Sequence, residues 1–394
     1  MNVQIAQRVQ AIKPSPTLAV TARAAEMRAA GHDIIGLGAG EPDFDTPVHV
    51  KEAAVVAINK GYTKYTPVDG IPALKQAVID KFARDNQLEY SMKQILVSCG
   101  GKQSFYNMAQ ALLNPGDEVI IPAPYWVSYP DMVRLASAEP VIVNAGIEQG
   151  FKIGPKQLEA ALTEKTRLFV LNSPSNPTGV YYTPADLAEL GAVISNYPQV
   201  MVATDDMYEH ILWEGAPFKN ILNVCPQLYD RTIVLNGVSK AYAMTGWRIG
   251  YAGGPEPLIQ KMKTIQSQST SNPTSISQYA ALAALEGDQS FINGMVNTFK
   301  GRHDFVLKSL LQISGVECKP GQGAFYIFPS MIGAMDRLGI KTDVEFSEFL
   351  IEKAQVAVVP GSAFGAPGYV RISFATSQAN LEKAMERLHA TLNA

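Results

Sequence analysis

Short runs of apolar residues alternate with longer amphipathic stretches over most of the chain, from about residue 51 to residue 304. Several runs are apolar at successive positions, which is typical of strands buried on both faces, and the stretches between them have helical patterns. The alternation predicts an α/β domain in which a mostly parallel seven-stranded sheet is sandwiched by helices. The predicted strands are ILVSC (95–99), EVIIP (118–122), PVIVN (140–144), RLFVLN (167–172), VMVATD (200–205), TIVLNG (232–237) and RIGYAGG (248–254).

Shorter elements follow beyond about residue 320 and predict a second, smaller α+β domain. A helix over 17–30, with Thr17 as its N-cap and Gly31 at its end, is expected to pack with it. We therefore predict a large domain over 49–319 and a small domain built from 1–48 and 320–394. The elements expected in the C-terminal part are GAFYIF (323–328), a helix around 345–353, VAVVP (356–360), YVRISFA (369–375) and a last helix ending near Leu392.

Composition narrows the class of protein. The 394 residues are 47% apolar, and the net charge of −3 is spread without a basic stripe, so we expect neither nucleic acid nor membrane as a partner. No apolar run of about 18 residues and no signal peptide are recognisable. The three cysteines are widely separated, which predicts neither disulfides nor a zinc site and favours the reducing cytoplasm. We expect no metal.

Lys240 is the residue with the most specific chemical context, in NGVSKAYAMTGWRIGY (236–251). A lysine at a strand end is usually a solvated surface residue. At the carboxyl edge of a parallel sheet, however, ligands bind, and partial desolvation favours the neutral amine that attacks carbonyl groups. Arg248 offers a guanidinium suited to a phosphate. An aldehyde cofactor that carries a phosphate would use both residues.

This string, together with several others in the same order, resembles the fold-type I aminotransferases that use pyridoxal 5'-phosphate. The resemblance covers nearly the whole chain and is greatest to the bacterial aspartate aminotransferases of the 1-beta subgroup. The strings that carry it are IKPS (12–15), AGEPDF (39–44), Lys64-Tyr65, Tyr125-Trp126, Asn176-Pro177 and Arg371.

The resemblance implies how the cofactor is held. Lys240 binds it covalently, Asp205 pairs with its protonated pyridine nitrogen, and Asn176, expected before a cis proline, hydrogen-bonds its phenolic oxygen. Asp206 is expected to point to the other face of the strand, as a turn or cap residue. The further cofactor-binding residues implied are Gly100, Gly101 and Lys102 at a helix start, Trp126 stacked on the ring, Tyr208, Ser239, Arg248 and, from the neighbouring subunit of a homodimer, Tyr65.

Arg371 is expected to bind the α-carboxylate of the substrate, with Gly40, Trp126 and Asn176 beside it. From the residues alone, an internal carboxylate is the alternative partner, because a lone buried guanidinium is costly. The segment 267–273 lacks the arginine that one branch of the family uses for the distal carboxylate. The resemblance assigns that role to Lys102 and links Lys13 to the acceptance of prephenate.

The implied activity is transamination by a ping-pong route, with L-aspartate and 2-oxoglutarate as first choice and prephenate as an additional acceptor. Lys240, Asp205 and Tyr208 are the expected catalytic residues, with the freed Lys240 amine moving the α-proton. Aromatic or alanine specificity and a lyase of the same fold stay open as alternatives, as does a non-enzymatic sensor. A dinucleotide-binding dehydrogenase is disfavoured, because GLGAG (36–40) lacks the third glycine of that fingerprint and runs into a proline turn.

Overall fold

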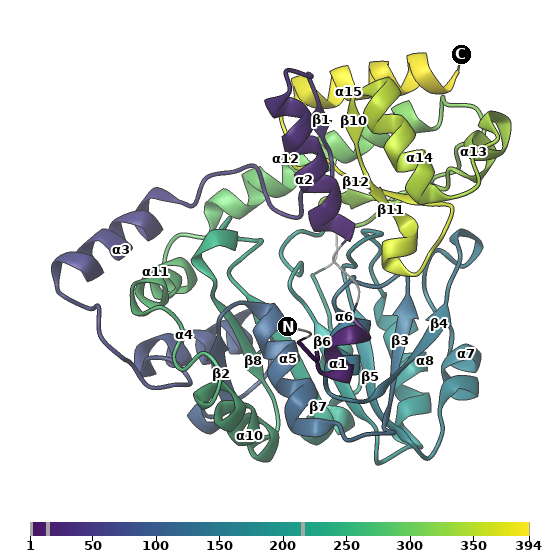
Figure 1. Cartoon of the computed structure of the whole chain (residues 1–394). Coiled ribbons are helices and arrows are strands. Elements are labelled where there is room, and N and C mark those ends of the chain that lie inside the picture. The colour runs from purple at the N-terminus through teal and green to yellow at the C-terminus, as the bar shows by residue number, and fades with distance from the viewer. Residues whose placement is uncertain (1–2, 13–15, 214–216, 394) are drawn as a thin grey trace.

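A seven-stranded sheet forms the centre of the larger part of the chain, in a computed structural model that describes residues 3–12, 16–213 and 217–393 (Figure 1). The strand order is β2-β8-β7-β6-β5-β3-β4, and all neighbours are parallel except β8, which is antiparallel to β2 and β7. The predicted sheet is confirmed. Its strands are β2 (Ile95–Ser98), β3 (Glu118–Ala123), β4 (Glu139–Asn144), β5 (Thr166–Asn172), β6 (Met201–Asp205), β7 (Thr232–Gly237) and β8 (Gly250–Gly253).

Successive residues of the strands contribute to two separate apolar cores, one on each face of the sheet. In β5, Phe169 and Leu171 pack into one core, whereas Leu168 and Val170 pack into the other. Both faces are covered by helices, which explains why the strands are apolar at successive positions. The first core is closed by α3 (Val48–Asn59), α4 (Pro72–Lys81), α7 (Pro155–Ala161), α8 (Pro184–Ser195) and α11 (Ser275–Glu286), and the second by α5 (Gly101–Leu112), α6 (Tyr129–Leu135) and α10 (Glu256–Ser267).

The C-terminal part forms a smaller unit at the top of Figure 1, around a three-stranded sheet of order β11-β12-β9. The first strand of the chain joins it, because β1 pairs with β10 in parallel. Phe299 and other side chains of α12 also pack into the apolar core of this smaller unit. The division between the two domains at residue 319 therefore stays a prediction. The strands are β1 (Ile35–Gly36), β9 (Tyr326–Ile327), β10 (Val356–Ala357), β11 (Val359–Pro360) and β12 (Val370–Ser373).

The helix expected over 17–30 is α2 (Pro16–Ala29), which contacts β1, β10 and β11, so its packing with the smaller unit is confirmed. The side chain of Thr17, its predicted cap, lies outside the described residues. In the described parts of the chain, no helix combines the length and apolar character needed to span a bilayer. The remaining helices are α1 (Gln7–Gln10), α9 (Ile221–Val224), α12 (Ser290–Leu310), α13 (Ile332–Leu338), α14 (Asp343–Phe349) and α15 (Gln378–Leu392).

Candidate active site

Lys240 lies just beyond the carboxyl end of β7, at the edge of the sheet where β6 ends in Asp205. Its Nζ donates a hydrogen bond of 2.6 Å to the carbonyl oxygen of Gly40, 200 residues earlier. Burial lowers the pKa of Lys240 to about 8, and the charges of Arg371 and Arg248 act in the same direction. The burial of Lys240 thus confirms the desolvation that the sequence predicted, and a lowered pKa favours the neutral amine.

Asp205 is held by a residue that the motifs did not single out. The hydroxyl of Tyr129 donates to Oδ2 of Asp205 at 2.5 Å, and the N–H of Met207 donates to Oδ1 at 3.3 Å. Burial raises the pKa of Asp205, while these two hydrogen bonds and the Lys240 charge lower it. Tyr129 packs edge-on against Trp126, but Trp126 precedes α6, and no local pattern in the sequence connects Tyr129 with Asp205.

Asp206 points away from this group, as the alternation along a strand predicted. It opens the turn that follows β6, where its carbonyl oxygen accepts the N–H of Glu209 at 2.9 Å. Its carboxylate accepts from the hydroxyl of Thr204 at 2.6 Å and from the amide of Asn220 at 2.8 Å. Burial raises its pKa to about 7, and the Glu209 charge adds to this effect. Asp206 is thus a turn residue with a fully buried side chain.

The start of α5 forms a cradle with Arg248. Gly100 has a φ of 85°, and a Cβ at this position would lie 2.3 Å from Nη2 of Arg248, so only glycine fits here. The first N–H groups of a helix have no partner within the helix, and Gly101 and Lys102 are the first two residues of α5. Ser239 is buried next to Lys240. Backbone donors, a helix dipole and a guanidinium together suit a phosphate.

Arg371 is 2% exposed and has no carboxylate within ion-pair distance among the described residues. Nη1 donates to Oδ1 of Asn176 at 2.9 Å and Nη2 to the carbonyl oxygen of Gly38 at 2.7 Å. Its Nε is buried and has no partner in the described part of the chain. The ring centroids of Tyr326 and Phe364 lie 4.5 and 5.0 Å from the guanidinium carbon of Arg371. The alternative of an internal carboxylate is therefore not found, and an external anion would complete the group.

The peptide bond between Asn176 and Pro177 is cis, as expected. Lys102 has its Nζ 5.2 Å from the ring centroid of Trp126, and partial burial together with the Arg248 charge lowers its pKa. The hydroxyl of Tyr208 lies 3.0 Å from that of Tyr326, a second residue that the motifs missed. A buried tyrosine hydroxyl in an apolar strand needs a partner, and this requirement is the signal that GAFYIF (323–328) offered.

Tyr65 is not brought into this group: its side chain is 92% exposed, and its expected role in another subunit stays a prediction. Lys13, which the resemblance links to prephenate, lies outside the described residues.

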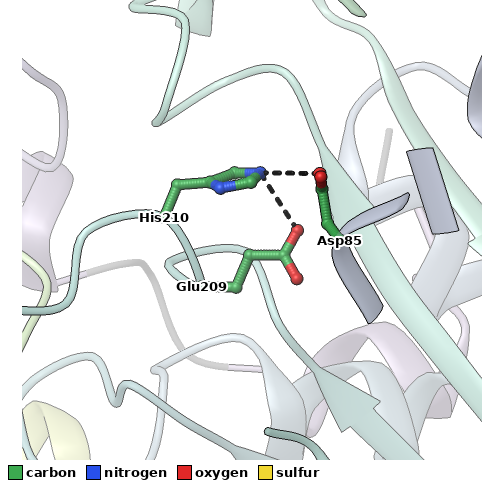
Figure 2. Close-up of side chains that lie close together, drawn as sticks. All are labelled: Asp85, Glu209 and His210. Carbon is green, nitrogen blue, oxygen red and sulfur yellow. Dashed lines mark ion pairs between the residues drawn. The ribbon is translucent and has the colours of Figure 1, made fainter. Parts of the chain in front are cut away.

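Asp85, Glu209 and His210 lie close together, and their side chains offer ligand atoms for a metal ion (Figure 2). Glu209 and His210 directly follow Tyr208 in the chain. The imidazole Nε2 is 3.3 Å from Glu209 and 3.5 Å from Asp85. However, the ammonium group of the fully buried Lys81 forms an ion pair with Glu209. This lysine already supplies the cation that the carboxylates require, so the cluster is explained as a buried ion-pair network.

Residues 32–388 match the model of the class I and II aminotransferases, and the chain belongs to this family. Among its relatives, the aspartate/prephenate aminotransferase of Nitrosomonas europaea is 58% identical over 99% of this chain and 100% of its own length. The aspartate aminotransferase structure from Rhizobium meliloti superposes with a TM-score of 0.96 at 48% identity, covering 100% of this chain and 99% of that one. The Thermus thermophilus aspartate aminotransferase with maleate gives 0.93 at 43% identity, covering 99% and 100%.

The protein is an aminotransferase whose cofactor is pyridoxal phosphate. The residues present fit this group in three respects. Gly100 allows the Arg248 guanidinium to lie against the backbone at the start of α5, where cation and helix N-terminus together suit a phosphate. Lys240 provides an amine with a pKa of about 8 for the aldehyde. Asp205 provides a buried carboxylate for a cationic ring nitrogen, since no ion pair engages it among the described residues.

Proposed function

We propose that this aminotransferase transfers the amino group of L-aspartate to 2-oxoglutarate, giving oxaloacetate and L-glutamate, and that prephenate is a further acceptor. The observation that carries the proposal is the buried Arg371, whose Nε has no partner among the described residues and which faces no internal carboxylate. The names of the relatives support the choice of aspartate, and maleate in the Thermus structure is a four-carbon dicarboxylate. Lys102 supplies a second positive charge for a distal carboxylate.

The roles of the residues follow from their positions. Pyridoxal phosphate supplies an aldehyde that links to amines and a ring that accepts an electron pair from the α-carbon. Lys240 would hold this cofactor, and its freed amine would move the α-proton, while the carboxylate of Asp205 would keep the ring nitrogen protonated. Arg371 orients the α-carboxylate, with Asn176 and Gly40 beside it. The phosphate would be bound by the backbone N–H groups at the start of α5, from Gly100 to Lys102, and by the side chains of Ser239 and Arg248. Tyr208 would contact the cofactor through its hydroxyl, and Trp126 would stack on the ring.

Covalent attachment tests the assignment of the cofactor site. The holoenzyme is reduced with borohydride, digested and analysed by mass spectrometry, and we expect the cofactor on the peptide that contains Lys240. Lys240→Ala should leave no labelled peptide, whereas Lys261→Ala, at an exposed position of α10, should be labelled like the wild type. Label on another lysine, or none on any, would refute the assignment.

The substrate assignment is tested with Lys102→Ala. Loss of the distal charge should lower kcat/KM for aspartate by about tenfold to a hundredfold, because a hydrogen bond to a charged group contributes about 1.5–3 kcal/mol. Alanine has no distal carboxylate, so its kcat/KM should change much less. Equal losses for both donors would remove aspartate as the preferred substrate. A panel of oxo acids that includes prephenate then establishes the acceptors.

We further propose that the chain forms a homodimer in which Tyr65 reaches the cofactor phosphate of the partner. In support, α3 buries one side against the core and leaves apolar residues of its other side in solvent, which marks an interaction surface. Sedimentation should give twice the chain mass, and Val55→Glu should shift it to the monomer. Leu311→Glu, an equally exposed apolar position after α12, serves as control. The exposed large apolar residues in and after α3 are Val48, Val55, Val56, Ile58, Tyr62 and Tyr65.

We infer a cytoplasmic location from the chemistry of the thiols. Cys99, Cys225 and Cys318 are all free, and burial raises the pKa of each. Such thiols persist in a reducing compartment. Cell fractionation tests the location, and recovery of the enzyme outside the cytoplasm would contradict it.

A further inference from the structure

Tyr326 contacts several of the proposed site residues although it comes from the smaller unit. It is fully buried in β9, next to β12, which carries Arg371. The guanidinium carbon of Arg371 lies 4.5 Å from the centroid of its ring. Its hydroxyl lies 3.0 Å from the hydroxyl of Tyr208, and a Cβ on Gly40 would lie 3.4 Å from the same oxygen. One side chain therefore links Arg371, Tyr208 and Gly40.

The two hydroxyl groups have two protons but only one hydrogen bond between them. Burial raises the pKa of both tyrosines, while the Arg371 charge opposes the rise, so both are protonated near neutral pH. Either oxygen can be the donor in the shared bond. If Tyr208 donates to an oxygen of the cofactor, its own oxygen can only accept, and Tyr326 must then be the donor. Hydrogen bonds in such a chain strengthen one another.

We propose that Tyr326 is a positioning residue that donates its hydroxyl proton to Tyr208 and thereby directs the hydroxyl of Tyr208 toward the phenolic oxygen of the cofactor. The proposal rests on the cofactor site proposed above. Tyr208 without this donor turns toward the space left by the Tyr326 hydroxyl or rotates freely. The ring of Tyr326 has a separate role, because it packs against the guanidinium of Arg371.

The test follows the absorbance of the holoenzyme against pH, without substrate. A hydrogen bond from Tyr208 stabilises the form of the bound cofactor that has lost its proton, since that form has more negative charge at the phenolic oxygen. Weakening this bond raises the midpoint of the titration. We expect Tyr326→Phe to raise the midpoint by about half a pH unit and Tyr208→Phe to raise it by about one unit.

The double variant Tyr208→Phe/Tyr326→Phe separates an indirect effect from a direct one. If Tyr326 acts through Tyr208, the double variant has the midpoint of Tyr208→Phe alone. An unchanged midpoint in Tyr326→Phe, or a double variant whose shift is the sum of the two single shifts, would overturn the proposal. Tyr369→Phe, which removes a half-buried hydroxyl elsewhere in the smaller unit, should titrate like the wild type.

Borohydride labelling of Lys240 in the wild type establishes the cofactor site on which the role of Tyr326 depends. A wild type without label would remove the site assignment together with this proposal, whereas labelled wild type with an unshifted Tyr326→Phe would remove this proposal alone. Because phenylalanine keeps the ring against Arg371, KM for aspartate in Tyr326→Phe should stay within about twofold, whereas Tyr326→Leu should raise it several-fold. Thermal unfolding of each variant shows that it is folded.

Discussion

At Asp205, burial and hydrogen bonding act on one carboxyl group in opposite directions. Burial raises its pKa, and the hydrogen bond from Tyr129 lowers it. In the proposed role of Asp205, the carboxylate has to be ionised to pair with a cationic ring nitrogen. The hydrogen bond from Tyr129 would then extend the pH range over which this pairing holds.

We expect Tyr129→Phe to weaken cofactor binding at low pH more than at high pH. Without the hydroxyl, the pKa of Asp205 rises further, because its carboxylate loses a hydrogen bond that stabilises the ionised form. As the solution is acidified, Asp205 of the variant therefore takes up its proton at a higher pH than Asp205 of the wild type. Fluorescence titration of the apoenzyme with pyridoxal phosphate from pH 5 to 8 measures this, and the fall in affinity should begin at a higher pH than in the wild type.

Tyr106→Phe is the matched control, because Tyr106 packs against the same core but makes no contact with Asp205. Parallel affinity profiles for Tyr129→Phe and the wild type would show that the hydroxyl does not control Asp205.

The sequence identified candidate residues that stand in unusual local strings. It did not identify residues whose importance depends on contacts with distant parts of the chain. Lys240 stands at the end of a strand and Arg371 within an apolar strand. These unusual contexts singled out both residues from the sequence alone. Tyr129 and Tyr326 act on residues 76 and 118 positions away. No periodicity encodes such a pairing, because it depends on how β6 and β9 are brought to one place by the fold.

At the level of elements, α5 and the strand before it form the phosphate cradle through Gly100. We expect Gly100→Ala to weaken cofactor affinity about tenfold or more, because its φ of 85° strains any other residue and its Cβ would displace Arg248. Equilibrium titration of the apoenzyme measures the change. Gly146→Ala should have wild-type affinity, since Gly146 has a φ of −77° and nothing within 4 Å of the added Cβ.

The turn that carries Tyr208 is anchored to the end of α4 by a buried ion pair. Glu209 accepts hydrogen bonds from Asn86 at 2.6 Å and from Asn236 at 2.8 Å, and pairs with Lys81. Burial alone would raise the pKa of Glu209, but the charges of Lys81 and His210 and the hydrogen bonds to its carboxylate together outweigh burial and lower the pKa to about 2. The pair therefore stabilises the fold above the unfolded pKa of about 4.5, and this contribution is lost as the pH falls toward 2.

Lys81→Met should lower the free energy of unfolding by about 3–5 kcal/mol at pH 7, because it leaves a buried carboxylate without its cation. The loss should be smaller at pH 4, where Glu209 of the variant can take up a proton. Urea unfolding at both pH values measures the free energy of unfolding of the variant and of the wild type. Lys51→Met removes an exposed lysine that lies 4.0 Å from Asp45, and should change the stability by less than about 1 kcal/mol. A similar small change for Lys81→Met would contradict the proposed anchoring.

Long elements were predictable and very short ones were not. All seven strands of the large sheet were predicted within a few residues, since each is buried on both faces and flanked by turns. The two-residue strand β1, in contrast, lies in a glycine-rich segment and has no periodicity of its own. It exists because the backbone of Ile35 and Gly36 pairs with Val356 and Ala357 of β10, more than 300 positions later.

For the molecule as a whole, the exposed α3 and Tyr65 lead to a prediction about shared sites. In the proposed dimer, each site combines Lys240 of one subunit with Tyr65 of the other. Lys240→Ala should be inactive, and Tyr65→Ala should bind cofactor poorly. A hybrid of the two variants has one site with both defects and one site in which both residues are intact.

Mixing the two variants, unfolding them together and refolding them should therefore restore activity that neither has alone. Random pairing makes half of the dimers hybrid, each with one intact site, so recovery should approach about a quarter of the wild-type rate at a cofactor concentration that saturates the wild type but not Tyr65→Ala. Tyr65→Ala combined with Lys240→Ala in the same chain supplies the control, because mixing it with Lys240→Ala creates no intact site. If each subunit instead holds a complete site of its own, no recovery above the sum of the separate variants is expected, and Tyr65 would then have no role across the interface.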